Sequence, residues 1–150
     1  MVFGPDITEQ LARARADLRL GVPIVLAGSR PVLVMAAETL TPARLTGLLA
    51  MGGEPGLAIS ARRAETLKAR AYDGSFARVL LPRDATLRWV KSIADPADDL
   101  RSPLKGPLAC ARGGDATPHG LAIDLIKSAR LLPAAVILDL ADAGQFAQQN

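Results

Sequence analysis

The chain has few of the residues that staple small secreted domains or hold metals through sulfur. Its 150 residues include a single cysteine, Cys110, and a single histidine, His119. One cysteine excludes an internal disulfide and any zinc site built from several thiolates. We therefore expect a protein of the reducing cytoplasm.

Long apolar runs and aromatic clusters are also missing. No run approaches the roughly 20 apolar residues that span a bilayer, and the N-terminus has no basic segment followed by a long apolar one. We expect neither a membrane anchor nor secretion by that route. Aromatic residues make up 3% of the chain, and the net charge of +3 comes from arginines interleaved with acids. Without a basic stripe and stacking aromatics, we expect no nucleic-acid partner.

Alternating helix and strand patterns fill the rest of the chain. A capping box at Asp6 and Glu9 opens the first helix, Thr41-Pro42 opens the second, and Asp84 is expected to cap the fourth. Strands are expected at 23–27, 31–37, 56–60, 76–81, 108–112 and 134–138, and helices at 7–20, 42–51, 61–71, 85–94 and 119–131. These patterns predict an α/β or α+β fold, a single layered domain with a mixed sheet of about six strands packed by about five helices.

The hydrophobic content of 49% suffices for one compact domain. We expect that domain to occupy residues 1–144, with a polar tail or linker at 145–150. The longest expected loop runs from Asp95 to Gly106, and no internal repeat or low-complexity segment is present.

Several short blocks follow one another along the chain, namely Leu33-Val-Met-Ala-Ala-Glu-Thr-Leu-Thr-Pro42, Ala58-Ile-Ser-Ala-Arg-Arg-Ala64, Pro107-Leu-Ala-Cys-Ala-Arg-Gly-Gly114, Ala122-Ile-Asp-Leu125 and Leu132-Pro-Ala-Ala-Val-Ile137. Their order resembles 3,4-dihydroxy-2-butanone-4-phosphate synthase, the enzyme of riboflavin biosynthesis that splits ribulose 5-phosphate. The resemblance implies that family's fold, a site at a twofold dimer interface, and magnesium held beside carboxylates that move protons.

The acidic residues that the family uses are largely missing here. Its acidic loop, DDExRENEGD, lies between the first two strands, where this chain has Ala27-Gly-Ser-Arg-Pro-Val32 without any acid. Its GHTEA segment opens a later helix, where this chain has Asp115-Ala-Thr-Pro-His-Gly-Leu121. No acid falls on the glutamate position, which becomes Gly120 or Leu121, so the expected metal site has lost carboxylates on both sides.

Three candidate sites follow from these residues. His119 is a candidate metal ligand, or else an ordinary polar residue at a helix N-terminus. Arg83 and Thr86, which match the family's Asp-Arg-Ala-x-Thr-Ile segment, are candidate phosphate-binding residues, or else a solvated arginine and a first-turn threonine. Glu38 is a candidate base, or else a local capping group.

Weaker patterns carry less chemistry. Cys110 is expected to behave as a small hydrophobe in a strand. The acids Asp95, Asp98 and Asp99 lack the spacing of a calcium loop and are expected at the surface rather than around a metal. The run from Arg112 to Gly114 reads as a short turn rather than a phosphate loop.

The leading hypothesis is therefore a degenerate domain of the kind fused N-terminal to GTP cyclohydrolase II. It would be non-catalytic, need no cofactor, form a homodimer and serve a structural or dimerisation role. One alternative is an active magnesium-dependent lyase with relocated ligands such as His119, Glu38 and Asp115. Two others are a sugar-phosphate-binding regulatory module and an unrelated α/β interaction module.

Overall fold

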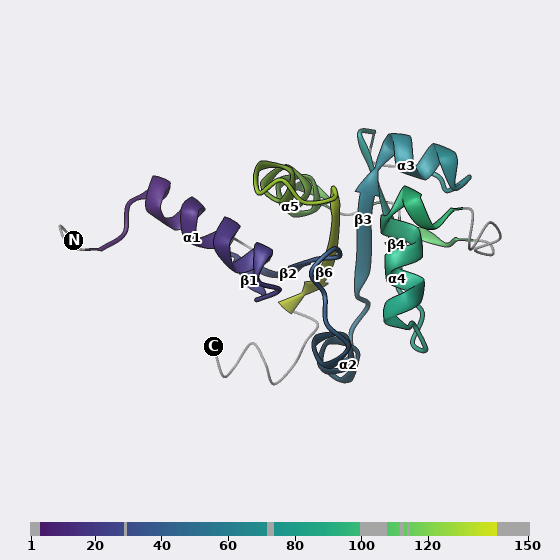
Figure 1. Ribbon diagram of the computed structural model, residues 1–150, viewed down its shortest axis with the longest axis horizontal. Helices are drawn as coiled ribbons and strands as arrows, with labels where there is room; N and C mark the ends of the chain where they lie inside the picture. The colour runs from purple at the N-terminus through teal and green to yellow at the C-terminus, as the bar shows by residue number, and fades with distance from the viewer. Residues whose placement is uncertain are drawn as a thin grey trace.

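The computed structural model describes residues 4–28, 30–71, 74–99, 108–111, 113 and 115–140. These residues form six strands, five α-helices and one short 3-10 helix (Figure 1). The helices are α1 (Ile7–Arg19), α2 (Pro42–Ala50), α3 (Ala61–Thr66), α4 (Leu87–Ala94), η1 (Pro96–Asp98) and α5 (Thr117–Ser128). The strands are β1 (Ile24–Leu26), β2 (Val32–Ala36), β3 (Gly56–Ser60), β4 (Phe76–Leu80), β5 (Cys110–Ala111) and β6 (Ala134–Asp139). The predicted numbers of strands and α-helices are confirmed.

The strands form one sheet in the order β1-β2-β6-β3-β4-β5, and each of its described pairings is antiparallel. The α+β class is confirmed, but the sheet is antiparallel rather than mixed. The connection through α2 carries the chain from β2 to β3 in the same direction, and these strands would pair in parallel if they were neighbours. The last strand, β6, instead lies between them and runs the opposite way.

Helices cover both faces of the sheet. On one face, Leu33 and Met35 of β2 pack with the core that α2, α3 and α4 close. On the other, Val32, Val34 and Ala36 pack with the core that α1 and α5 close. This alternation follows from the two-residue period of a strand. In Figure 1, α1 and α5 lie on one side of the sheet and α3 and α4 on the other, and the N-terminal turns of α1 extend away from the rest.

The ends of the helices confirm two predicted caps, correct a third cap and correct the end of one helix. Asp6 and Glu9 form the predicted capping box, and the Thr41 hydroxyl accepts from the next turn of α2. The N-cap of α4 is Thr86 rather than Asp84, since the Thr86 hydroxyl accepts from the Trp89 N–H at 3.0 Å. The third helix stops at Thr66, five residues short of the predicted end, because Lys68 adopts a left-handed φ of 60°.

Two expectations concern the limits of the domain. The predicted boundary at 144/145 lies outside the described residues and stays a prediction. Within the part of the chain that the structure describes, no helix is both long and apolar enough to cross a membrane.

Candidate functional site

Two segments that the family likeness assigns to the active site line one pocket. This pocket, called the His119 pocket below, has a volume of about 230 Å³. Its walls come from the β1–β2 connection, the start of α5 and the end of β6, namely Leu26, Ala27, Gly28, Arg30, Val32, Asp115, Thr117, Pro118, His119, Leu121 and Asp139. Segments almost 90 positions apart in the sequence therefore meet, as the resemblance implies.

The charged groups of the His119 pocket have partners within the protein. The Nη2 atom of Arg30 lies 2.7 Å from Asp139 Oδ2, and the Nε of Arg30 donates to the same oxygen at 2.8 Å. Asp115 Oδ1 accepts from the backbone N–H of Thr117 at 3.0 Å. Hydrogen bonds from Thr117, with a smaller attraction from His119, lower the pKa of Asp115 below its ordinary value.

This set of side chains does not fit the magnesium that the resemblance implies. Mg²⁺ needs several oxygen ligands in near-octahedral geometry, but among the described residues no three His, Cys, Asp or Glu side chains are grouped to hold a metal. The acid-free connection instead supplies Arg30, whose positive charge opposes a cation, and Asp139 already accepts from that guanidinium. Sequence reasoning missed both residues, although Arg30 stands in the segment where the acids are missing.

Glu38 lies far from His119 and Asp115. Val32, at the start of β2, lines the His119 pocket, whereas Glu38 follows the other end of that strand. The rise of β2 alone separates the two ends by roughly 13 Å. Glu38 Oε1 accepts from the Leu132 N–H at 3.1 Å, so the carboxylate caps the turn before β6. The three relocated ligands of an active lyase are therefore not brought together.

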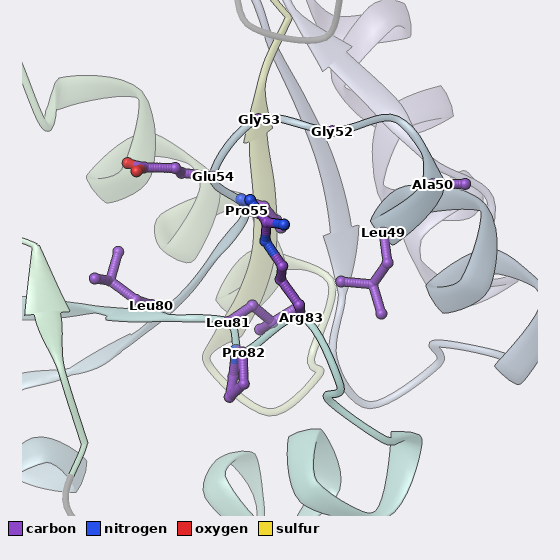
Figure 2. A pocket seen from close by; sticks show the side chains of 10 residues that line it. All are labelled: Leu49, Ala50, Gly52, Gly53, Glu54, Pro55, Leu80, Leu81, Pro82 and Arg83. Atoms are coloured by element: carbon purple, nitrogen blue, oxygen red, sulfur yellow. The ribbon is translucent and has the colours of Figure 1, made fainter.

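A second pocket, called the Arg83 pocket below, lies at the same end of the strands but on the opposite face of the sheet. It has a volume of about 550 Å³. It is lined by Leu49, Ala50, Gly52, Gly53, Glu54, Pro55, Leu80, Leu81, Pro82 and Arg83 (Figure 2). Arg83 is exposed, while Thr86 does not line the pocket and uses its hydroxyl to cap α4. The structure thus separates the roles of these two residues, and the phosphate role of Thr86 stays a prediction.

The remaining candidates have local structural roles. Asp99 forms a two-point ion pair with the buried Arg63, and Asp95 caps η1 by accepting from the Ala97 N–H at 2.9 Å. Cys110 is half-buried in the edge strand β5. Arg112 and Gly114 lie outside the described residues.

Comparison with known proteins bears on the fold. No protein-family model matches the chain. A GTP cyclohydrolase-2 from Azospirillum brasilense is 29% identical over 133 residues, which cover 87% of this chain and 34% of that protein. The chain therefore spans about a third of the length of this curated relative.

Solved structures show the same fold at low sequence identity. A two-domain 3,4-dihydroxy-2-butanone 4-phosphate synthase from A. baumannii superposes with a TM-score of 0.59 and 18% identity, covering 93% of this chain and 53% of that one. The corresponding synthase of Candida albicans gives 0.59 and 17%, with 93% and 89% coverage. A cation-free form of such a synthase gives 0.60 and 14%, with 86% and 74% coverage. The chain therefore has the fold of 3,4-dihydroxy-2-butanone 4-phosphate synthase and is related in sequence to part of a GTP cyclohydrolase-2.

Proposed function

We propose that this chain is a non-catalytic, cytoplasmic domain of a GTP cyclohydrolase II protein in riboflavin biosynthesis, with a structural or dimerisation role. The observation that carries the proposal is the Arg30–Asp139 ion pair in the His119 pocket. It places a cation where the resemblance implies a metal, and it engages one of the two carboxylates that line this pocket among the described residues.

Three further features support the absence of lyase chemistry. Enolising a sugar phosphate requires a base near the substrate carbon, yet Asp115 is a weak base because its pKa is lowered. Glu38 caps a turn at the other end of β2. The pocket of about 230 Å³ is also smaller than the roughly 300–1,000 Å³ of most ligand sites.

The structural role is supported by the relatives. The A. brasilense relative is a GTP cyclohydrolase-2 of which this chain matches only 34%. A domain that keeps the fold of a synthase without its acids can still supply the surface through which two copies associate. We expect a homodimer and no cofactor.

The test is formate release from ribulose 5-phosphate. The pure protein is incubated with the substrate and Mg²⁺, and formate is followed by NMR beside an authentic synthase under the same conditions. We expect no protein-dependent formate. Release at a rate that a chelator abolishes would make the chain an active lyase and refute the proposal.

Light scattering tests the proposed dimerisation role. We expect a mass near twice the 15.7 kDa of the chain. A monomer at all accessible concentrations, which also fails to associate with a GTP cyclohydrolase II domain, would remove the dimerisation role.

A further inference from the structure

The Arg83 pocket has the dimensions and lining of a small-molecule site. Its volume of about 550 Å³ falls within the usual range for ligand pockets. The end of α2 supplies Leu49, and the segment from β4 toward α4 supplies Leu81 and Pro82, which form apolar walls. Polar groups come from Arg83 and from the connection between α2 and β3. A few polar groups among apolar walls are typical of sites that orient an organic ligand.

Arg83 reaches into this pocket without a protein partner. Figure 2 shows its side chain running from Pro82 toward Pro55, beneath the Gly52–Gly53 loop. It makes no hydrogen bond and no ion pair with any residue that the structure describes. The Glu54 side chain points away from Arg83 in the same view. The guanidinium is therefore available to an anion, which it binds more strongly than it binds a neutral acceptor.

The loop above Arg83 presents three successive backbone N–H groups. Met51 donates its N–H to the Leu48 carbonyl at 3.1 Å. Beyond it, the N–H groups of Gly52, Gly53 and Glu54 donate to no group in the described part of the chain. The φ angle changes from −73° at Met51 to +79° at Gly52 and +75° at Gly53. Successive N–H groups in such a turn form concave anion-binding nests.

Steric space at the loop is consistent with a bound group. A Cβ built on Gly52 would meet nothing within 4 Å, so an anion can approach the backbone there. The carboxyl end of α2 opposes an anion with about half a unit of negative charge. Binding should therefore depend on the full positive charge of Arg83.

We propose that the Arg83 pocket binds a small phosphate ester. The phosphate would lie between Arg83 and the N–H groups of residues 52–54, and the organic part would pack against Leu49, Leu81 and Pro82. The site uses neither Thr86 nor any residue of the His119 pocket, which lies on the other face of the sheet. It therefore adds a ligand to the structural role without requiring lyase activity.

The test is an NMR titration of the labelled protein with inorganic phosphate and with ribulose 5-phosphate. We expect both probes to shift the amide signals of Gly52, Gly53 and Glu54, and the ester to bind at least threefold more tightly. Arg83→Gln should weaken binding at least tenfold. Arg88→Gln, which removes an exposed arginine from α4 outside the pocket, is the matched control and should leave the affinity unchanged.

A second variant tests whether the pocket binds an anion, by removing a negative charge from its lining. Glu54→Gln should bind phosphate at least as tightly as the parent protein, because it removes a negative charge from the lining. Shifts confined to other segments, equal losses in Arg83→Gln and Arg88→Gln, or weaker binding by Glu54→Gln would each overturn the site. Equal affinity for inorganic phosphate and ribulose 5-phosphate would show that the organic part of the ester does not contribute to binding. The formate assay reports on the other pocket, so failure of one proposal leaves the other standing.

Discussion

The two ends of the sheet differ in how their polar groups are used. At one end lie Ala36, Ser60 and Ala134, and side chains there bond to the backbone of distant elements. The side chains that donate to a backbone carbonyl at this anchored end are Arg19 to Ala129, Thr39 to Leu18, Arg44 to Gly21, and Arg63 to Ser92 and Ile93. The Glu38 carboxylate accepts from the Leu132 N–H. Each of these bonds joins two elements, so this end stabilises the fold.

The other end, called the pocket end, begins at Val32, Gly56 and Leu80 and holds both the His119 and the Arg83 pockets. Here Arg83 and three loop N–H groups have no bond to the described residues, and Arg30 pairs with Asp139 near solvent. The anchored end also has a pocket, of about 260 Å³, but the Arg63 side chain in its wall is bonded to Ser92, Ile93 and Asp99. At the pocket end, by contrast, the Arg83 side chain has no such bond to the described residues. Substitutions at the anchored end should therefore cost more stability than matched substitutions at the pocket end.

Two glycines with the same backbone angle give the largest contrast. Gly21 and Gly52 both have a φ of +79°, but a Cβ at Gly21 would meet the Thr39 carbonyl oxygen at 2.6 Å, while one at Gly52 would meet nothing within 4 Å. Both alanine variants carry the left-handed penalty of about 1–2 kcal/mol. Gly21→Ala adds a backbone overlap, so we expect a loss of about 3 kcal/mol or more. Urea unfolding of both variants measures the difference.

Equal losses in the two glycine variants would contradict the contrast. The overlap at Gly21 would then be relieved by a small shift of the α1–β1 turn, and the anchored end would be less rigid than its hydrogen bonds indicate. The slope of the denaturant transition is the control, since an unchanged slope shows that both variants unfold from the same compact state.

Two arginine–aspartate pairs provide the next contrast. Both have an N–O distance of 2.7 Å, but the Arg63 side chain is 9% exposed and that of Arg30 is 60% exposed. Asp99→Asn should lower the free energy of unfolding by about 1–2 kcal/mol, because it leaves a buried guanidinium with less compensation. Asp139→Asn should cost at most about 0.5 kcal/mol, as expected for an exposed pair. A larger loss in Asp139→Asn would show that Arg30 is a structural residue.

A threonine pair gives a smaller effect. The Thr39 hydroxyl donates to the Leu18 carbonyl at 2.6 Å and so ties the end of α1 to the segment after β2. Thr39→Val keeps the shape and should cost about 1 kcal/mol. Thr46→Val, at an exposed position of α2, is the control and should change the free energy of unfolding by less than about 0.5 kcal/mol. If the two variants have the same free energy of unfolding, the hydrogen bond from Thr39 does not stabilise the anchored end.

Local signals in the sequence predicted most elements of the fold. The capping box at Asp6, the Thr41-Pro42 start and the apolar strand predicted at 31–37 all depend on signals within a few residues, and the structure confirms them. The misplaced cap of α4 also has a local cause. Asp84 and Thr86 are both good N-caps, and the choice depends on where β4 ends and packing begins.

The antiparallel sheet and the sites could not be predicted in the same way. Insertion of β6 between β2 and β3 depends on pairing between segments that are far apart in the sequence, such as Val32 with Asp139 and Gly56 with Ile137. Burial of Arg63 likewise depends on Asp99 and on the carbonyl groups at the end of α4. The resemblance predicted that the two segments lining the His119 pocket would meet, but it did not predict the Arg30–Asp139 ion pair. The Gly52–Gly53 pair is a local signal for the end of a helix, whereas its position above Arg83 depends on the packing of α2 against the end of β4.

The pKa of Asp115 gives the smallest effect and the closest test of the His119 pocket. Bonds from Thr117 lower this pKa, with a smaller contribution from His119. A folded-state pKa below the unfolded value adds stability above the unfolded pKa, and that stability is lost as the pH falls through the folded value. Asp115→Asn should therefore be slightly less stable than the parent protein at neutral pH, and the difference should vanish in acid.

An NMR titration of the Asp115 carboxyl group should show a higher pKa in Thr117→Val, which lacks the hydroxyl donor. We expect added Mg²⁺ to leave the titration unchanged, because the charged side chains of this pocket do not fit a metal. A metal bound at Asp115 would instead lower the pKa of its carboxyl group further. A magnesium-dependent shift of both Asp115 and His119 signals would restore the metal site and with it the case for an active lyase.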